Sequence, residues 1–325
     1  MEQLNKDEFF TLALNLDLPD LLRFCSSNKK INENLCLRNE IWLYKLRKDF
    51  PNFKKLENKS YKEIYQLLFS LTKLKKELNL KETIYEIYDL QELNLSKKEL
   101  TVIPKEIKYL VNLRQLNLND NKLKEIPKEI GYLINLQRFD LEGNQLEDIK
   151  ELGNLINLKT LFLSYNWLEN IPKELGKLVN LEVISLSVNR LTEFPVELSP
   201  LINLRELYLD RNTISSIPKE IDQFKNLQLL ILSNNWLTSI PPELEDIPNL
   251  EHLDLSGNEL LTIPKELGNI LNIEHLDLSY NKLLTIPKEL SRLKNLRRLD
   301  LSGNKLKEIP KELSENKKLK IVMKK

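Results

Sequence analysis

The chain has 325 residues, and its 49 basic and 48 acidic residues give a formal net charge of +1 at pH 7. This balance provides no overall field that would attract nucleic acid or an anionic membrane. No apolar stretch reaches the length of a membrane-spanning helix. We therefore expect neither nucleic acid nor a membrane among the partners.

The start of the chain, residues 1–8, lacks the basic segment and apolar core of a secretory signal peptide. Cys25 and Cys36 are the only cysteines, and they do not match the disulfide caps that flank the repeats of secreted repeat proteins. We expect a cytoplasmic protein in which both cysteines are reduced and contribute to packing.

The first 70 residues carry apolar side chains at helical spacing. Helical spacing is found over residues 9–16, from residue 21, over residues 31–46 and over residues 60–69. Residues 17–20 break the first helix and provide an N-cap for the second. This part of the chain is therefore predicted to be a small all-α domain.

Several short motifs in these helices resemble an F-box. The matching residues are Asp7-Glu8-Phe9-Phe10, Asp17-Leu18-Pro19-Asp20-Leu21-Leu22-Arg23, Cys25, Lys29 or Lys30, and Glu40-Ile41-Trp42. Asn5-Lys6 stands where the family carries Leu-Pro, and Ile31 or a neighbour replaces the Trp that usually follows the Cys-Lys pair. The resemblance implies docking to the Skp-type adaptor of a cullin–RING ubiquitin ligase through Leu14, Leu16, Leu18, Pro19, Leu21, Leu22, Ile41 and Trp42.

The motif Ser60-Tyr61-Lys62-Glu63-Ile64-Tyr65 follows the F-box-like segment. A leader of this kind is similar to those on repeat proteins of large DNA viruses. For a viral protein, the ligase and the cytoplasm would be those of the host.

Residues 71–89 are interpreted as a linker that caps the following domain, and residues 90–325 follow one repeating pattern, LxxLxLxxNxLxxIPxELxxLxN. The pattern occurs in ten copies, at intervals of 23 residues except for one interval of 22. The first copy carries Lys98 where the others carry the first Asn. Residues beyond the last copy form a polar C-terminal cap.

This pattern resembles the leucine-rich repeat. The resemblance implies an α/β solenoid with a curved parallel sheet on its concave side and short helical turns outside. Independently, the Leu-x-Leu alternation places both leucines on one face of a short strand. One copy cannot bury this face alone, so neighbouring copies must stack and share a core.

The first Asn of each copy follows the strand, where the backbone leaves the sheet. Its amide can donate to and accept from the turning backbone of adjacent copies. We expect a buried structural ladder of Asn121, Asn144, Asn166, Asn189, Asn212, Asn235, Asn258, Asn281 and Asn304.

Large apolar side chains occupy outward positions in the middle copies, and neighbouring strands lie about 4.8 Å apart, so these side chains should form one patch. Exposed apolar patches usually mark binding sites. An alternative is that Trp167 and Trp236 fold over the turns as packing. The predicted protein-binding patch on the concave face comprises Phe162, Tyr165, Trp167, Val183, Val188, Tyr208, Arg211, Leu229, Ile231 and Trp236.

His252, Asp254, His275 and Asp277 lie on two consecutive strands with the same outward orientation. They could hold a divalent transition metal, but duplication of one copy explains the pattern more simply, so we predict no metal. The sequence contains no Gly-rich phosphate loop or nucleophile elbow, and we predict no cofactor and no catalysis.

The preferred hypothesis is a two-part adaptor, in which the N-terminal helices dock a ligase and the repeats present a target protein. The first alternative is a stand-alone interaction scaffold whose helices only cap the repeats. The second is a secreted bacterial repeat protein that binds a host receptor.

Overall fold

The structure, a computed structural model, describes residues 6–27, 29, 32–316 and 318–324. It divides into two compact units, Met1–Asp89 and Leu90–Lys325. Asn5, Lys30 and Ile31, which enter the F-box comparison, lie outside the described residues.

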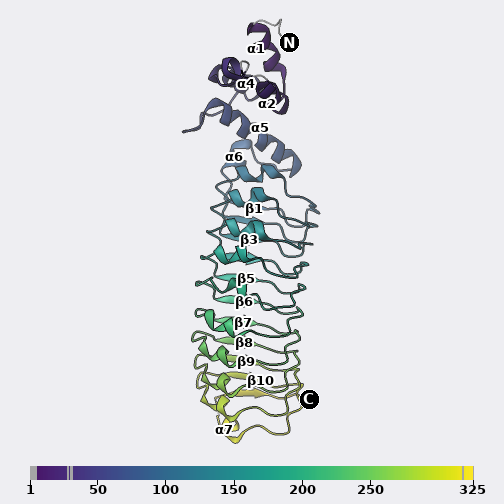
Figure 1. Ribbon diagram of the computed structural model, residues 1–325, viewed down its shortest axis with the longest axis vertical. Coiled ribbons are helices and arrows are strands. Elements are labelled where there is room, and N and C mark those ends of the chain that lie inside the picture. Colours follow the sequence, from purple (N-terminus) through teal and green to yellow (C-terminus); the bar gives the residue numbers. More distant parts are fainter. Residues whose placement is uncertain (1–5, 28, 30–31, 317, 325) are drawn as a thin grey trace. The chain divides into compact units, whose positions relative to one another are not determined.

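The first unit is helical (Figure 1). Asp17 begins the second helix because its Oδ1 accepts a hydrogen bond from the backbone N–H of Asp20 at 2.9 Å. Ser60 and Glu63 form a capping box at the start of the longest helix. In the described part of the chain, no helix is both long and apolar enough to cross a bilayer. The helical elements are α1 Lys6–Asn15, α2 Leu18–Ser27, the π-helical segment η1 Asn32–Cys36, α4 Asn39–Asp49, α5 Tyr61–Glu77 and α6 Ile84–Tyr88.

The core of this unit centres on Trp42 and Tyr65, whose rings lie 5.8 Å apart. Lys45 is also buried, and its Nζ donates to the carbonyl of Leu16 at 2.9 Å and pairs with Asp49 at 2.9 Å. A buried lysine is tolerated when it is paired in this way. It joins the end of α1 to α4.

Cys25 of α2 and Cys36 of η1 form a disulfide bond. The sequence-based prediction of two reduced, packing cysteines was therefore wrong. Their two Cα atoms lie 5.8 Å apart, a separation that allows the bond. No sequence periodicity reveals this proximity.

The second unit is a solenoid around one parallel sheet, in which each strand pairs with the strands before and after it in the sequence (Figure 1). The predicted fold class is confirmed. The strands are β1 Glu92–Asn94, β2 Gln115–Asn117, β3 Arg138–Asp140, β4 Thr160–Phe162, β5 Val183–Ser185, β6 Glu206–Tyr208, β7 Leu229–Ile231, β8 His252–Asp254, β9 His275–Asp277, β10 Arg298–Asp300 and β11 Lys320–Val322.

Most connections between strands contain a short 3-10 helix, and a Pro stands as N-cap of all but one of these. Proline suits this place because the first turn of a helix leaves its N–H groups without intrahelical partners. The outer helices are η2 Lys105–Tyr109, η3 Lys128–Tyr132, η4 Lys150–Asn154, η5 Lys173–Lys177, η6 Val196–Leu198, η7 Lys219–Gln223, η8 Pro242–Asp246, η9 Lys265–Asn269, η10 Lys288–Arg292 and the α-helical α7 Lys311–Ser314.

The asparagine that follows each strand from β2 to β10 makes one repeated set of hydrogen bonds. In the example of Asn212, Nδ2 donates to the carbonyls of Leu186 and Leu209, each at 3.0 Å, and Oδ1 accepts from the N–H of Leu191 at 3.0 Å. The amide thus bridges its own repeat and the preceding one. The same pattern is made by Asn121, Asn144, Asn166, Asn189, Asn235, Asn258, Asn281 and Asn304.

Candidate functional site

The outward side of the sheet, which we call the sheet face, is formed by the first and third residues of each strand. The middle residue of every strand from β1 to β10 is an apolar residue that is buried in the core. Strand pairing is in register, so equivalent residues of successive repeats are direct neighbours. Each outward position therefore forms a continuous row across the sheet.

The third-residue row is apolar and aromatic in its middle. It runs Phe162, Ser185, Tyr208 and Ile231 across β4 to β7. The first-residue row contributes Val183 and Leu229 over the same strands. All six side chains are partly exposed, so they form a contiguous surface.

The loops that follow these strands extend the surface. Tyr165 is 51% exposed and Trp236 is 61% exposed, while Trp167 and Val188 are half-buried and Arg211 is exposed. We call the ten predicted residues, which lie on or next to β4 to β7, the central patch. None of them is buried.

Three patch residues adopt a left-handed backbone conformation. The φ angles are 55° at Tyr165, 53° at Val188 and 54° at Arg211. Glycine occupies the equivalent position in three other repeats, with φ between 64° and 66°. A left-handed conformation is costly for a β-branched residue such as Val188. The same conformation occurs at the equivalent Asp120, Asn234 and Tyr280, which are not patch residues, so it belongs to the turn that follows each strand.

Neighbouring polar groups hold the aromatic side chains of the patch. The guanidinium of Arg138 lies 4.5 Å from the ring centroid of Phe162, and that of Arg190 lies 5.0 Å from the ring of Trp167. The hydroxyl of Tyr208 donates to Glu206 at 2.8 Å. Burial and this hydrogen bond raise the pKa of Tyr208 to about 12, so the hydroxyl stays protonated at neutral pH.

Beyond the patch, the sheet face carries the predicted His and Asp pairs. The rings of His252 and His275 stack with centroids 4.6 Å apart and planes at 6°. Burial and the neighbouring His252 lower the pKa of His275, which favours a neutral imidazole. In residues 6–27, 29, 32–316 and 318–324, no group of three or more His, Cys, Asp or Glu side chains is arranged to hold a metal ion.

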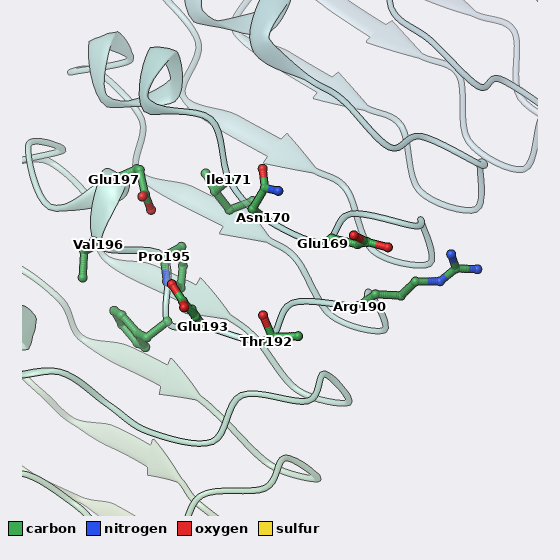
Figure 2. A pocket seen from close by; sticks show the side chains of 10 residues that line it. Glu169, Asn170, Ile171, Arg190, Thr192, Glu193, Pro195, Val196 and Glu197 are labelled. Atoms are coloured by element: carbon green, nitrogen blue, oxygen red, sulfur yellow. The ribbon is translucent and has the colours of Figure 1, made fainter.

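A separate cavity of about 540 Å³ lies off the sheet face, on the loops around η6 (Figure 2). Ile171, Phe194 and Pro195 line it together with Glu169, Asn170, Arg190, Thr192, Glu193, Val196 and Glu197. The labelled polar side chains are spread along the wall, and Arg190 points away from the others (Figure 2). They do not converge on a point where a substrate atom could react.

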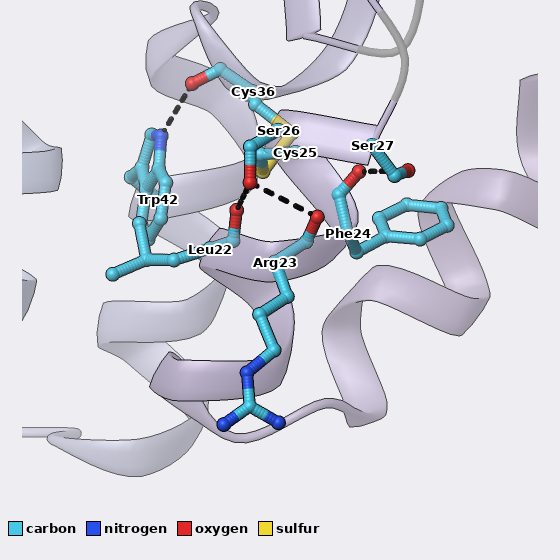
Figure 3. The surroundings of a disulfide bond; sticks show 8 residues. All are labelled: Leu22, Arg23, Phe24, Cys25, Ser26, Ser27, Cys36 and Trp42. Atoms are coloured by element: carbon cyan, nitrogen blue, oxygen red, sulfur yellow. Dashed lines mark hydrogen bonds between the residues drawn. A yellow bond between two sulfur atoms is a disulfide. The ribbon is translucent and has the colours of Figure 1, made fainter.

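The eight predicted adaptor-binding residues separate by burial. Leu18, Leu21, Ile41 and Trp42 are buried in the core of the helical unit. Leu14, Leu16 and Leu22 are half-buried, and Pro19 is exposed. The indole N–H of Trp42 donates to the carbonyl of Cys36 at 2.8 Å, next to the disulfide (Figure 3).

Two rows on the outer edge of the repeats were missed by the sequence reasoning. The last Asn of the pattern donates to a carbonyl of the preceding repeat, as Asn203 does to Val179 at 2.8 Å. Its regular recurrence was a usable signal for this second structural row. The residue before that Asn is an exposed aliphatic residue in six repeats: Val111, Ile134, Ile156, Val179, Ile202 and Leu271.

Three family models match the repeat unit. The model described as a leucine-rich repeat region matches residues 196–322, the leucine rich repeat model matches residues 89–146, and the model of two leucine rich repeats matches residues 134–177. No curated protein matches the chain significantly.

The solved structures similar to this chain include plant receptor domains. The ectodomain of the receptor kinase GASSHO1/SCHENGEN3 from Arabidopsis thaliana, in complex with CASPARIAN STRIP INTEGRITY FACTOR 2, is 37% identical with a TM-score of 0.64, over 71% of this chain and 29% of that chain. A TDR receptor is 30% identical with a TM-score of 0.62, over 72% of this chain and 47% of that one.

The Arabidopsis receptor kinase HAESA, in complex with the peptide hormone IDA and the co-receptor SERK1, is 31% identical with a TM-score of 0.59, over 67% of this chain and 39% of that chain. The chain thus spans less than half the length of each of these three relatives.

Proposed function

Because this chain belongs to the leucine-rich repeat family, we propose that it is a protein-binding adaptor that performs no catalysis itself. The target is held on the sheet face of the repeat unit. The observation that carries this proposal is the central patch, whose large apolar and aromatic side chains lie together on or next to β4 to β7 and are all at least partly exposed. Such surfaces mark interaction sites, and Trp and Tyr are frequent anchors of binding energy.

The relatives support a peptide or protein as the partner. One of the similar plant receptors is described in complex with CASPARIAN STRIP INTEGRITY FACTOR 2, and another in complex with the peptide hormone IDA and the co-receptor SERK1. Repeat solenoids present extended surfaces of this kind to their ligands.

Affinity capture from a eukaryotic lysate tests the repeat half of the proposal. The full chain should retain a specific protein, and Tyr208→Ala with Trp236→Ala should lose it while keeping wild-type circular dichroism. The matched control is Tyr132→Ala with Leu261→Ala, which truncates two exposed side chains outside the patch. Equal capture by wild type and the patch variant would contradict the proposal.

For the helical unit, the proposed partner is the Skp-type adaptor of a cullin–RING ubiquitin ligase, with the protein in the cytoplasm, or the host cytoplasm for a viral protein. The F-box-like residue pattern supports this role. Its four buried residues would hold the helices together, while Pro19, Leu14, Leu16 and Leu22 retain exposed surface for an adaptor. The chain would then act by bringing target and ligase together.

Binding of purified full-length chain to a purified Skp-type subunit tests this role. Pro19→Glu should abolish binding because it places a charge on an exposed part of the proposed contact. Met323→Glu, an exposed apolar-to-acidic change in the repeat unit, is the control and should bind normally. Failure of the wild-type chain to bind would remove the ligase role but not target binding.

A stand-alone interaction scaffold is the second candidate. The Cys25–Cys36 disulfide favours it, because disulfides persist mainly in oxidising compartments and the proposed ligase operates in a reducing one. Thiol labelling of the native protein in freshly lysed cells distinguishes the scaffold from the ligase adaptor. Two cysteines that do not react with the label support the scaffold, whereas two reactive cysteines support the adaptor.

A further inference from the structure

The central patch ends directly at two carboxylates on the sheet face. Ile231 of β7 pairs in register with Asp254 of β8, and Asp254 pairs with Asp277 of β9. The row of third residues therefore changes from apolar to acidic in one strand step. At the other end of the patch, Phe162 pairs with Asp140 of β3, but there Arg138 of the same strand lies over the Phe162 ring and offsets the charge of Asp140. The chain as a whole has a net charge of only +1, so this acidity is local.

The groups around these two carboxylates do not neutralise them. The ion pairs among the described residues include neither Asp254 nor Asp277, and Arg298 is paired with Asp300 at 3.0 Å. His252 and His275 stand beside them on the same strands, where burial and the stacked neighbour favour a neutral ring at His275.

Their remaining contacts come from the chain itself. Ser256 donates its N–H to Asp254 at 2.9 Å. Ser279 donates both its N–H, at 2.9 Å, and its hydroxyl, at 2.6 Å, to Asp277. Burial and the charges of Asp254 and Asp300 raise the pKa of Asp277. A cation from a partner would relieve this like-charge crowding.

The strand spacing sets the geometry of a bound segment. Asp254 lies two strand steps from Tyr208 and four from Phe162, which correspond to about 10 Å and about 19 Å. An extended chain advances about 3.3 Å per residue. A segment crossing the strands would therefore place its residues over Tyr208 and Asp254 about three positions apart.

Resting on the proposed function, we propose that the partner contributes an extended segment in which an apolar stretch of about five residues is followed by one or two basic residues. The apolar stretch covers the patch from Phe162 to Ile231, and the Lys or Arg side chains lie over Asp254 and Asp277. Complementary charge of this kind fixes direction and specificity more than total affinity.

Selection of a random linear peptide library on the immobilised full chain tests this inference. Peptides selected on wild type should carry Lys or Arg at one end of an apolar stretch, and Tyr208→Ala with Trp236→Ala serves as the background. Selection on Asp254→Asn with Asp277→Asn should retain the apolar stretch and lose the basic residues. Both Asn side chains keep an acceptor for the N–H groups of Ser256 and Ser279, so the fold should be preserved.

The best peptide selected on wild type should bind the Asp254→Asn, Asp277→Asn variant at least about tenfold more weakly than wild type. Its affinity for the control variant, Glu147→Gln with Asp246→Asn, should equal that for wild type. The control removes the same charge from exposed positions in a loop and on an outer helix. Apolar peptides without basic enrichment would overturn the inference and leave protein binding intact. Peptides that bind wild type and the patch variant equally, or no enrichment at all, would contradict both.

Discussion

Asn212 shows how a single side chain can join neighbouring repeats. It is 5% exposed, and its amide donates to three backbone carbonyls and accepts from one backbone N–H. The sequence predicted the position of this residue from its recurrence alone. It could not predict which backbone groups the amide would serve, because those depend on how the loops stack.

Asn212→Ala should lower the free energy of unfolding of the repeat unit by about 1–3 kcal/mol, because it strands buried backbone groups. Chemical denaturation followed by circular dichroism measures the change. Asn203→Ala removes an exposed hydrogen bond of the outer row and should lower the free energy of unfolding by clearly less than Asn212→Ala does. Wild-type stability in Asn212→Ala would contradict the structural role of the ladder.

The conformation of Val188 could be predicted only in part. The sequence indicated an exposed apolar side chain but not the left-handed backbone, with φ of 53°, that presents it. Gly143, Gly257 and Gly303 hint at this conformation, but the other repeats carry larger residues there.

Val188→Gly should therefore stabilise the repeat unit, by about 1 kcal/mol, since relief of a left-handed β-branched residue outweighs the entropy that glycine adds to the unfolded chain. It should also weaken target capture by removing a patch side chain. Val183→Gly, on a regular strand, should instead destabilise. A loss of stability in Val188→Gly comparable to that in Val183→Gly would show that the valine is not strained.

Among the elements, the strands and 3-10 turns of the repeats could be predicted, whereas the relation between α2 and η1 could not. Each repeat element follows from local apolar alternation and a recurring Pro. The disulfide joins two cysteines that stand 11 residues apart, in a part of the chain that does not follow the repeat. A feature that occurs once has no period to reveal it.

Cys25→Ser with Cys36→Ser should lower the stability of the helical unit by about 2–4 kcal/mol, because the bond restricts the unfolded chain. Thermal unfolding should show the change in a transition of the helical unit, while the transition of the repeat unit stays in place. Dithiothreitol should shift wild type in the same direction and leave the variant unaffected. If wild type and the double Ser variant unfolded at the same temperature, with and without dithiothreitol, the disulfide would not be a stabilising bond.

For the molecule as a whole, repetition explains why the solenoid could be predicted in such detail. The ten near-identical copies stack in one register. An alignment of the copies therefore predicts which residues form each row of the sheet face, and it predicts that Phe162, Tyr208 and Ile231 lie in one row. The helical unit lacks this redundancy. Its apolar residues divide between core and surface in a way that helical spacing alone did not resolve, as the burial of Leu21 and the exposure of Pro19 illustrate.

The most direct test of the central claim is site-specific photo-crosslinking in a lysate. A photoreactive phenylalanine analogue replaces Trp236, which is 61% exposed in the central patch, or Tyr132, which is 62% exposed on the outer helix η3. We predict that position 236 crosslinks to a specific protein and that position 132 does not. Crosslinks of equal yield from both positions, or from position 132 alone, would contradict protein binding on the central patch.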